Sequence, residues 1–123
     1  ISMHIDELGK YIREYRINNH YSQQEFAEIL GISKQTLSAY EQGTAAPAMP
    51  VIMRFIEHSG ASPEELTIIE EYINKIEAPE ERSAAIEAFS QISSITALQN
   101  NSGRTEFFNA LISKLRNNIK DVF

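Results

Sequence analysis

The chain contains no cysteine, which excludes disulfides, cysteine-based metal sites and thiol catalysis. It has no apolar run long enough to span a bilayer and no signal peptide, so we expect a cytoplasmic protein without membrane contact. No stretch alternates Val, Ile or Thr between hairpin turns, and we therefore expect no sheet. The patterns that are present predict an all-α protein.

Catalytic motifs are missing as well. We find no Ser/His/Asp set, no phosphate-binding loop and no HExxH motif, so we do not expect an enzyme. His4, His20 and His58 lack the spacing of metal ligands, and we expect neither a metal nor a cofactor. Adjacent acids could suggest acid–base chemistry, but first helical turns or outward helix faces explain them better. The pairs are Glu64–Glu65, Glu70–Glu71 and Glu80–Glu81.

Positive charge is scarce, although proteins that bind nucleic acid usually carry a basic patch. The net charge is −6. Residues 1–62 have five Lys or Arg and seven acids, which gives −2, and the remainder has six bases and ten acids, which gives −4. The five bases of the first half must therefore be placed before DNA binding can be inferred. They are Lys10, Arg13, Arg16, Lys34 and Arg54.

Cap residues divide the first half into five predicted helices. Ser22 and Glu25 have the spacing of a capping box, and Gly31 is the type of residue that ends a helix at positive φ. Ser62 followed by Pro63 is another start signal. The predicted helices begin near Ile5, Ser22, Ser33, Val51 and Ser62, with a loop over residues 44–50.

The third predicted helix, over residues 33–42, has two different faces. Leu37, Tyr40 and Glu41 point one way. Its other face is polar and carries Lys34, Gln35, Ser38 and Gln42. Because two short helices joined at Gly31 match a helix-turn-helix, this face is predicted to meet DNA. Glutamine can pair with adenine and lysine with guanine in the major groove, although an ordinary solvated face is the alternative.

Apolar residues also recur at helical spacing in the second half of the chain. One explanation is that they pack on one another and on the first half. The other is a dimer interface, because a repressor must place two recognition helices roughly 34 Å apart. We favour dimerisation without choosing a helix. The residues concerned are Ile73, Ile76, Ile86, Phe89, Ile92, Phe108, Ile112, Leu115 and Ile119.

Four segments, LGKYIREYR, YSQQEFAEILGIS, TLSAYEQG and GASPEEL, resemble the phage repressor and Cro family of helix-turn-helix proteins, also called the xenobiotic-response-element type. The resemblance covers residues 8–66. It implies a five-helix, lambda-repressor-like DNA-binding domain over residues 3–66, followed by a small helical C-terminal region over 67–123. It also implies a prokaryotic or phage transcriptional regulator, a dimeric repressor that reads a pseudo-palindromic operator with its third helix.

The resemblance also assigns roles to matching positions. The positions expected to face bases are Lys34, Gln35, Ser38 and Ala39. The positions expected to contact backbone phosphate are Gln23, Ser33, Thr36 and Thr44. Gln23 would in addition brace the recognition helix. Arg16 and Glu41 would form a structural ion pair between the first helix and the end of the third.

One departure from the family concerns the loop after Gly43. Family members often have basic residues there, whereas this loop reads Thr-Ala-Ala-Pro. We therefore expect modest affinity per monomer and a shallow salt dependence, since the salt slope follows the number of cation–phosphate contacts. A monomer this acidic should need dimerisation to hold an operator on double-stranded DNA.

A different class of function stays open beside the repressor. The acidic second half, with three amphipathic helices, could bind a protein partner. The chain would then be an antitoxin that also represses its own operon, or an adapter.

Overall fold

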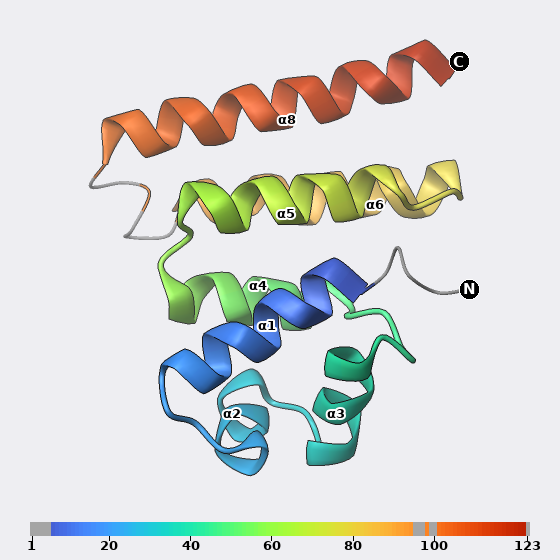
Figure 1. Cartoon of the computed structure of the whole chain (residues 1–123). Coiled ribbons are helices and arrows are strands. Elements are labelled where there is room, and N and C mark those ends of the chain that lie inside the picture. The colour runs from blue at the N-terminus through green and yellow to red at the C-terminus, as the bar shows by residue number, and fades with distance from the viewer. Residues whose placement is uncertain (1–5, 95–97, 99–100, 123) are drawn as a thin grey trace. The chain divides into compact units, whose positions relative to one another are not determined.

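The computed structural model describes residues 6–94, 98 and 101–122 and is all-α within them, which confirms the predicted fold class (Figure 1). No helix in these ranges is both long enough and apolar enough to cross a membrane. The elements are α1 (Asp6–Asn18), α2 (Gln23–Leu30), α3 (Lys34–Gln42), α4 (Met49–Ser59), α5 (Pro63–Asn74), α6 (Pro79–Ser90), the 3-10 turn η1 (Gln91–Ser94) and α8 (Ser102–Val122).

The chain divides into two compact units, Ile1–Phe55 and Ile56–Phe123, called unit 1 and unit 2 below. Unit 1 contains α1, α2, α3 and most of α4. Unit 2 contains the end of α4 together with α5, α6, η1 and α8. The boundary predicted after residue 66 falls inside α5, and the assignment of a separate role to each part of the chain stays a prediction.

The helix ends of unit 1 follow the predicted caps. Ser22 Oγ accepts a hydrogen bond from the Glu25 amide at 3.0 Å, and Glu25 Oε1 accepts one from the Ser22 amide at 2.8 Å, so the capping box is complete. Gly31 ends α2 with φ 73° and Gly43 ends α3 with φ 76°. Both glycines are left-handed, which ordinary side chains disfavour.

Unit 1 packs around a fully buried phenylalanine, Phe55 of α4. The rings of Tyr11, Tyr15 and Phe26 meet it edge-on, with centroid distances of 6.0, 5.2 and 6.1 Å. Helix α1 also approaches α3, because a Cβ at Gly9 would overlap the backbone carbonyl of α3's Tyr40. The absence of a side chain there lets the two helices approach closely. Helix α3 is thus held directly against α1.

Unit 2 consists mainly of α5, α6 and α8, and α8 packs against both of the others (Figure 1). Phe89 of α6 and Phe108 of α8 meet edge to face at 5.2 Å. Seven residues of the predicted dimer interface are at most 6% exposed in the single chain: Ile73, Ile86, Phe89, Ile92, Phe108, Ile112 and Leu115. Ile76 is half-buried, and the side chain of Ile119 lies outside the described residues.

These positions bear on the two explanations of the apolar stripes. Burial of these seven side chains in the single chain favours packing within unit 2, and the dimer interface stays a prediction. The apolar periodicity could not separate the two, because a core face and an interface face have the same spacing.

Two helix boundaries differ from the sequence prediction. Helix α4 begins at Met49 rather than at Val51, because Pro50 is tolerated in a first turn where its missing N–H is not needed. Helix α6 ends at Ser90, so Ile92 lies in η1.

Two glutamates expected on outward faces or in a first turn are buried. Glu65 is 1% exposed and Glu70 is 4% exposed. Glu70 lies 3.6 Å from Lys114 Nζ and accepts a hydrogen bond from Asn74, whose own side chain accepts one from Asn118 at 3.2 Å. Glu65 lies in the first turn of α5 as expected, but its side chain is buried. The expected outward position was wrong for Glu70, because α5 contacts both α6 and α8, which covers more than one of its faces.

Candidate nucleic-acid interface

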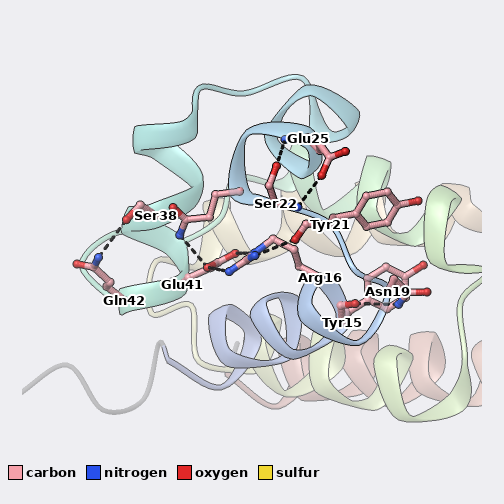
Figure 2. A network of polar contacts seen from close by, with 10 residues as sticks. Tyr15, Arg16, Asn19, Tyr21, Ser22, Glu25, Ser38, Glu41 and Gln42 are labelled. Atoms are coloured by element: carbon pink, nitrogen blue, oxygen red, sulfur yellow. Dashed lines mark hydrogen bonds and ion pairs between the residues drawn. The ribbon is translucent and has the colours of Figure 1, made fainter.

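An ion pair links the end of α1 to the end of α3 (Figure 2). The resemblance implied a pair between Arg16 of α1 and Glu41 of α3, and their side chains bond twice, at 2.7 Å from Nε to Oε2 and at 3.0 Å from Nη2 to Oε1. Arg16 Nη1 also donates to the Tyr21 carbonyl oxygen at 3.0 Å. The Arg16 and Glu41 side chains are only 11% and 2% exposed, so their two hydrogen bonds are largely shielded from water. This charge-assisted pair ties the end of α3 to α1.

Gln23, the first residue of α2, joins the same network. Its Nε2 donates to Glu41 Oε1 at 3.0 Å. A carboxylate only accepts hydrogen bonds, so Glu41 fixes which end of the Gln23 amide faces it. The second N–H and the oxygen of that amide remain for other partners. Gln23 therefore connects α2 to the end of α3 while keeping one donor and one acceptor.

Four predicted DNA-contact residues lie around one shallow, open hollow of about 280 Å³ beside α3, called the α3 hollow below. Its lining is Gln23, Lys34, Gln35 and Ser38. Lys34 and Gln35 are exposed and have no hydrogen-bond partner among the described residues. An ammonium group, two carboxamides and a hydroxyl thus share one solvent-facing site, and such groups can bind base edges and phosphates.

Ser38 is oriented by a residue that the sequence placed on the same face without assigning it a role. Gln42 Nε2 donates to Ser38 Oγ at 3.0 Å, one helical turn away (Figure 2). The serine oxygen is therefore an acceptor in this contact, and its own hydrogen remains to be donated outward. Ala39, the fourth expected base contact, is half-buried and does not line the α3 hollow.

The expected phosphate contacts other than Gln23 differ in what they can offer. Ser33 Oγ caps α3 by accepting from the Thr36 amide at 3.0 Å, and it lies 2.8 Å from Thr36 Oγ1. Whichever hydroxyl donates, the other keeps its hydrogen. Thr44 instead directs both its hydroxyl and its amide to the Ala39 carbonyl, at 3.3 and 3.0 Å. A phosphate contact from the Thr44 side chain would require that bond to break.

Arg54 is a residue that sequence reasoning counted as a base and did not place. It lies on α4, and its Nη1 donates to the Leu30 carbonyl oxygen at the end of α2, at 3.0 Å. No local pattern indicates this contact, because the partners are 24 residues apart. Arg54 does not line the α3 hollow, and Lys34 is the one cation in its lining.

Comparison with known families identifies this part of the chain. Residues 12–66 match the helix-turn-helix family model. These residues form a DNA-binding helix-turn-helix domain. The match confirms the resemblance predicted from the quoted segments, and it includes every residue that lines the α3 hollow. The match covers less than half of the chain, so it describes one domain of the protein rather than the whole protein.

A curated relative shares a shorter stretch with this helix-turn-helix protein. Antitoxin PezA of Streptococcus pneumoniae serotype 4 is 42% identical over 45 residues, which are 37% of this chain and 28% of that protein. The likeness thus spans little more than a quarter of the relative's length. No solved structure matches the chain.

Proposed function

We propose that this helix-turn-helix protein is a transcriptional repressor that binds a pseudo-palindromic operator as a dimer, with α3 in the major groove. The observation that carries the proposal is the gathering of Gln23, Lys34, Gln35 and Ser38 around the α3 hollow. The first two residues of α3 contribute an ammonium and a carboxamide. Gln23, the first residue of α2, and Ser38, one helical turn further along α3, line the same hollow.

Each side chain has a role that fits its chemistry. Lys34 donates to the acceptors of guanine, and Gln35 pairs with the donor and acceptor of adenine. Ser38 donates its remaining hydrogen to a base or phosphate oxygen. Gln23 uses its second N–H on a phosphate while Glu41 holds the first. The N-terminal end of α3 adds its unpaired amides, which favour a nearby anion.

The number of cations that can contact phosphates determines how the affinity of such a complex would depend on salt. The net charge is −6, and Arg16 is already paired with Glu41. Each cation–phosphate contact contributes a slope of about −0.9 in log K against log salt concentration. With Lys34 as the cation of the α3 hollow, we expect a slope well below that of strongly basic repressors. The dimer then supplies affinity by doubling the contacts.

Selection of binding sites from a random duplex library, at low and at physiological salt, tests the proposal with the full chain. The expected result is an enriched inverted repeat whose half-sites lie roughly one turn, about 34 Å, apart. Enrichment of a single half-site would argue against the dimer. No enrichment at either salt concentration would contradict sequence-specific binding by the protein alone.

Substitutions in the α3 hollow separate base reading from phosphate binding. Gln35→Ala should change the preferred base at one position of each half-site, with a cost of about 1–3 kcal/mol for the original sequence. Gln23→Ala should weaken all sites alike. Gln24→Ala is the matched control, because the Gln24 side chain bonds Glu28 within α2, at 3.2 Å, and does not line the hollow. An unchanged preference in Gln35→Ala, at equal stability, would contradict its assignment.

A second candidate function is an antitoxin that also represses its own operon, or an adapter. It is favoured by the similarity to a protein named an antitoxin and by the −4 charge of residues 63–123. Light scattering of the protein purified from its own host, with and without high salt, distinguishes the two. A homodimer alone supports the repressor. A stoichiometric complex with one other protein, disrupted by substitutions on the surface of unit 2, supports the antitoxin or adapter.

A further inference from the structure

Arg54 ties α4 to the turn of the helix-turn-helix. Leu30 is the last residue of α2, and carbonyl groups at a helix end have no partner within the helix. Arg54 Nη1 donates to the Leu30 oxygen at 3.0 Å. A guanidinium at this position also faces the negative end of the α2 dipole. The contact therefore satisfies a helix end with a charged donor from another helix.

The Arg54 guanidinium also packs against the glycine that makes the turn. A Cβ at Gly31 would overlap Arg54 Nη1 and come within 3.0 Å of its Cζ. Gly31 has φ 73°, so it is needed for its backbone conformation as well as for the space. The amide of Ile32 closes the same turn by donating to the Ala27 carbonyl at 3.0 Å. The Arg54 guanidinium therefore occupies the space beside Gly31 that a side chain at this position would need.

The turn determines where α3 begins. Ser33, the N-cap of α3, comes two residues after Gly31, and Lys34 and Gln35 follow directly. The far end of α3 is held by Glu41 through Arg16 and Gln23. The N-terminal end carries the groups proposed to meet DNA. On that side, the Arg54 contact links the turn to α4.

We propose that Arg54 is a positioning residue for DNA recognition: by holding the Leu30–Gly31 turn against α4, it fixes the orientation in which Lys34 and Gln35 reach the bases. This inference rests on the proposed DNA-binding function of α3. Arg54 needs no contact with DNA in this role. The competing possibility is that the partly exposed Arg54 binds a phosphate directly, and the two roles give different salt dependences.

The experiment compares Arg54→Ala and Arg54→Lys with Arg13→Ala, which removes the same charge from an exposed position on α1. Affinity for the selected operator is measured over a range of salt concentrations, beside helicity by circular dichroism. Arg54→Ala should lower affinity about tenfold with the salt slope unchanged, and should reduce the preference at the bases read by Lys34 and Gln35. Arg54→Lys should recover only part of the affinity, because lysine lacks the planar fork.

Three outcomes would overturn the proposal. A salt slope shallower by about 0.9, with base preference unchanged, would make Arg54 a phosphate contact. Equal effects of Arg54→Ala and Arg13→Ala would make it an ordinary surface charge. A loss of helicity in Arg54→Ala that Arg54→Lys does not share would limit its role to stability.

Two measurements need no DNA, so they test the positioning even if the wild-type protein selects no operator. Amide hydrogen exchange at Thr36 and Leu37 should be faster in Arg54→Ala than in wild type, and unchanged in Arg13→Ala. Gly31→Ala should destabilise the protein less in the Arg54→Ala background than in wild type, because the guanidinium that its Cβ would strike is gone. Unchanged exchange and additive effects would contradict the contact as a constraint on α3.

Discussion

The same four-residue pattern begins a helix in each unit, with opposite results for its glutamate. In unit 1, Ser22 and Glu25 bond each other's backbone amides and both stay exposed. In unit 2, Ser62 accepts from the Glu65 amide at 3.2 Å, but the Glu65 side chain turns inward and accepts from Ser59. The pattern therefore predicts where a helix starts and leaves open where its glutamate points.

The two glutamates differ accordingly in their protonation. Hydrogen bonds from the backbone amide and then the side chain of Ser22 hold the pKa of Glu25 below its usual value. Burial raises the pKa of Glu65 to about 7, against smaller opposing effects from Ser59, the Ala61 amide and Arg104. Glu65 Oε1 is buried without a hydrogen-bond partner among the described residues. The capped acid of unit 1 stays ionised, and the buried acid of unit 2 is partly neutral near pH 7.

Unit 1 also contains a buried acid, Glu41, whose hydrogen-bond partners differ from those of Glu65. Glu41 is 8% exposed but receives two bonds from Arg16 and one from Gln23. In unit 2, Arg104 instead donates to the Gly60 carbonyl at 2.9 Å. An opposite charge in contact with a buried carboxylate favours its ionised form, whereas burial without such a contact raises the pKa of the carboxyl group. The comparison predicts that removing the partner of Glu41 lowers the stability of unit 1, and that a change of pH alters the stability of unit 2.

The largest effect should come from Arg16→Ala, which leaves Glu41 as a buried charge without its ion-pair partner. We expect a loss of roughly 3–5 kcal/mol in the free energy of unfolding, measured by urea denaturation at pH 7. Arg13→Ala, on the exposed side of the same helix, is the control and should change stability by less than about 0.5 kcal/mol.

A double variant shows whether the charge itself causes the damage. Arg16→Met with Glu41→Leu replaces the pair by apolar groups of similar size and should recover most of the lost stability. If the double variant is as unstable as Arg16→Ala, the packing of the arginine rather than the unpaired charge accounts for the loss.

The next largest effect should be the pH dependence contributed by Glu65. Its pKa is 4.5 in the unfolded chain and about 7 in the fold. Between these values the folded state binds more protons than the unfolded state, so stability falls as pH rises from about 4.5 to about 7. The difference of about 2.5 between the two pKa values corresponds to a loss on the order of 3 kcal/mol in the free energy of unfolding, and this loss is complete above pH 7.

Glu65→Gln tests this by keeping the shape and removing the charge. The variant should lack this fall, so that it is more stable than wild type at pH 8 and similar at pH 4. Glu64→Gln is the matched control, since Glu64 is exposed in the same helical turn. Parallel pH profiles for wild type and Glu65→Gln would show that Glu65 is ionised in the fold, against the comparison drawn above.

Local sequence patterns predicted the helix ends well because their causes are local. The caps at Ser22, Gly31 and Gly43 depend on residues within one turn. The resemblance located the α3 hollow, which is built largely from one short helix and the start of its neighbour. Arg54 could not be placed from the sequence, because its partner at Leu30 lies 24 residues away.

The second unit was harder to predict for the same reason. An apolar stripe shows that a helix face is covered, and only the tertiary structure shows that α5, α6 and α8 cover one another. The burial of Glu65 and Glu70 likewise follows from packing, whereas the sequence shows only acids next to helix starts or other acids. Charge spacing describes a helix surface only after the neighbours of that helix are known.

The smallest effect should come from the exposed cap in unit 1. Ser22→Ala removes the acceptor of the Glu25 amide and should cost about 1 kcal/mol. Glu25 keeps its bond from the backbone amide of residue 22, so its pKa stays lowered and its contribution is present above pH 4.5 and lost as pH falls. Ser22→Gly, which glycine's tolerance at caps makes milder, should cost only a few tenths of a kcal/mol. If both variants cost as much as Arg16→Ala, then the start of α2 is coupled to the Arg16–Glu41–Gln23 network, and the cap contributes to holding α3 as well as to starting α2.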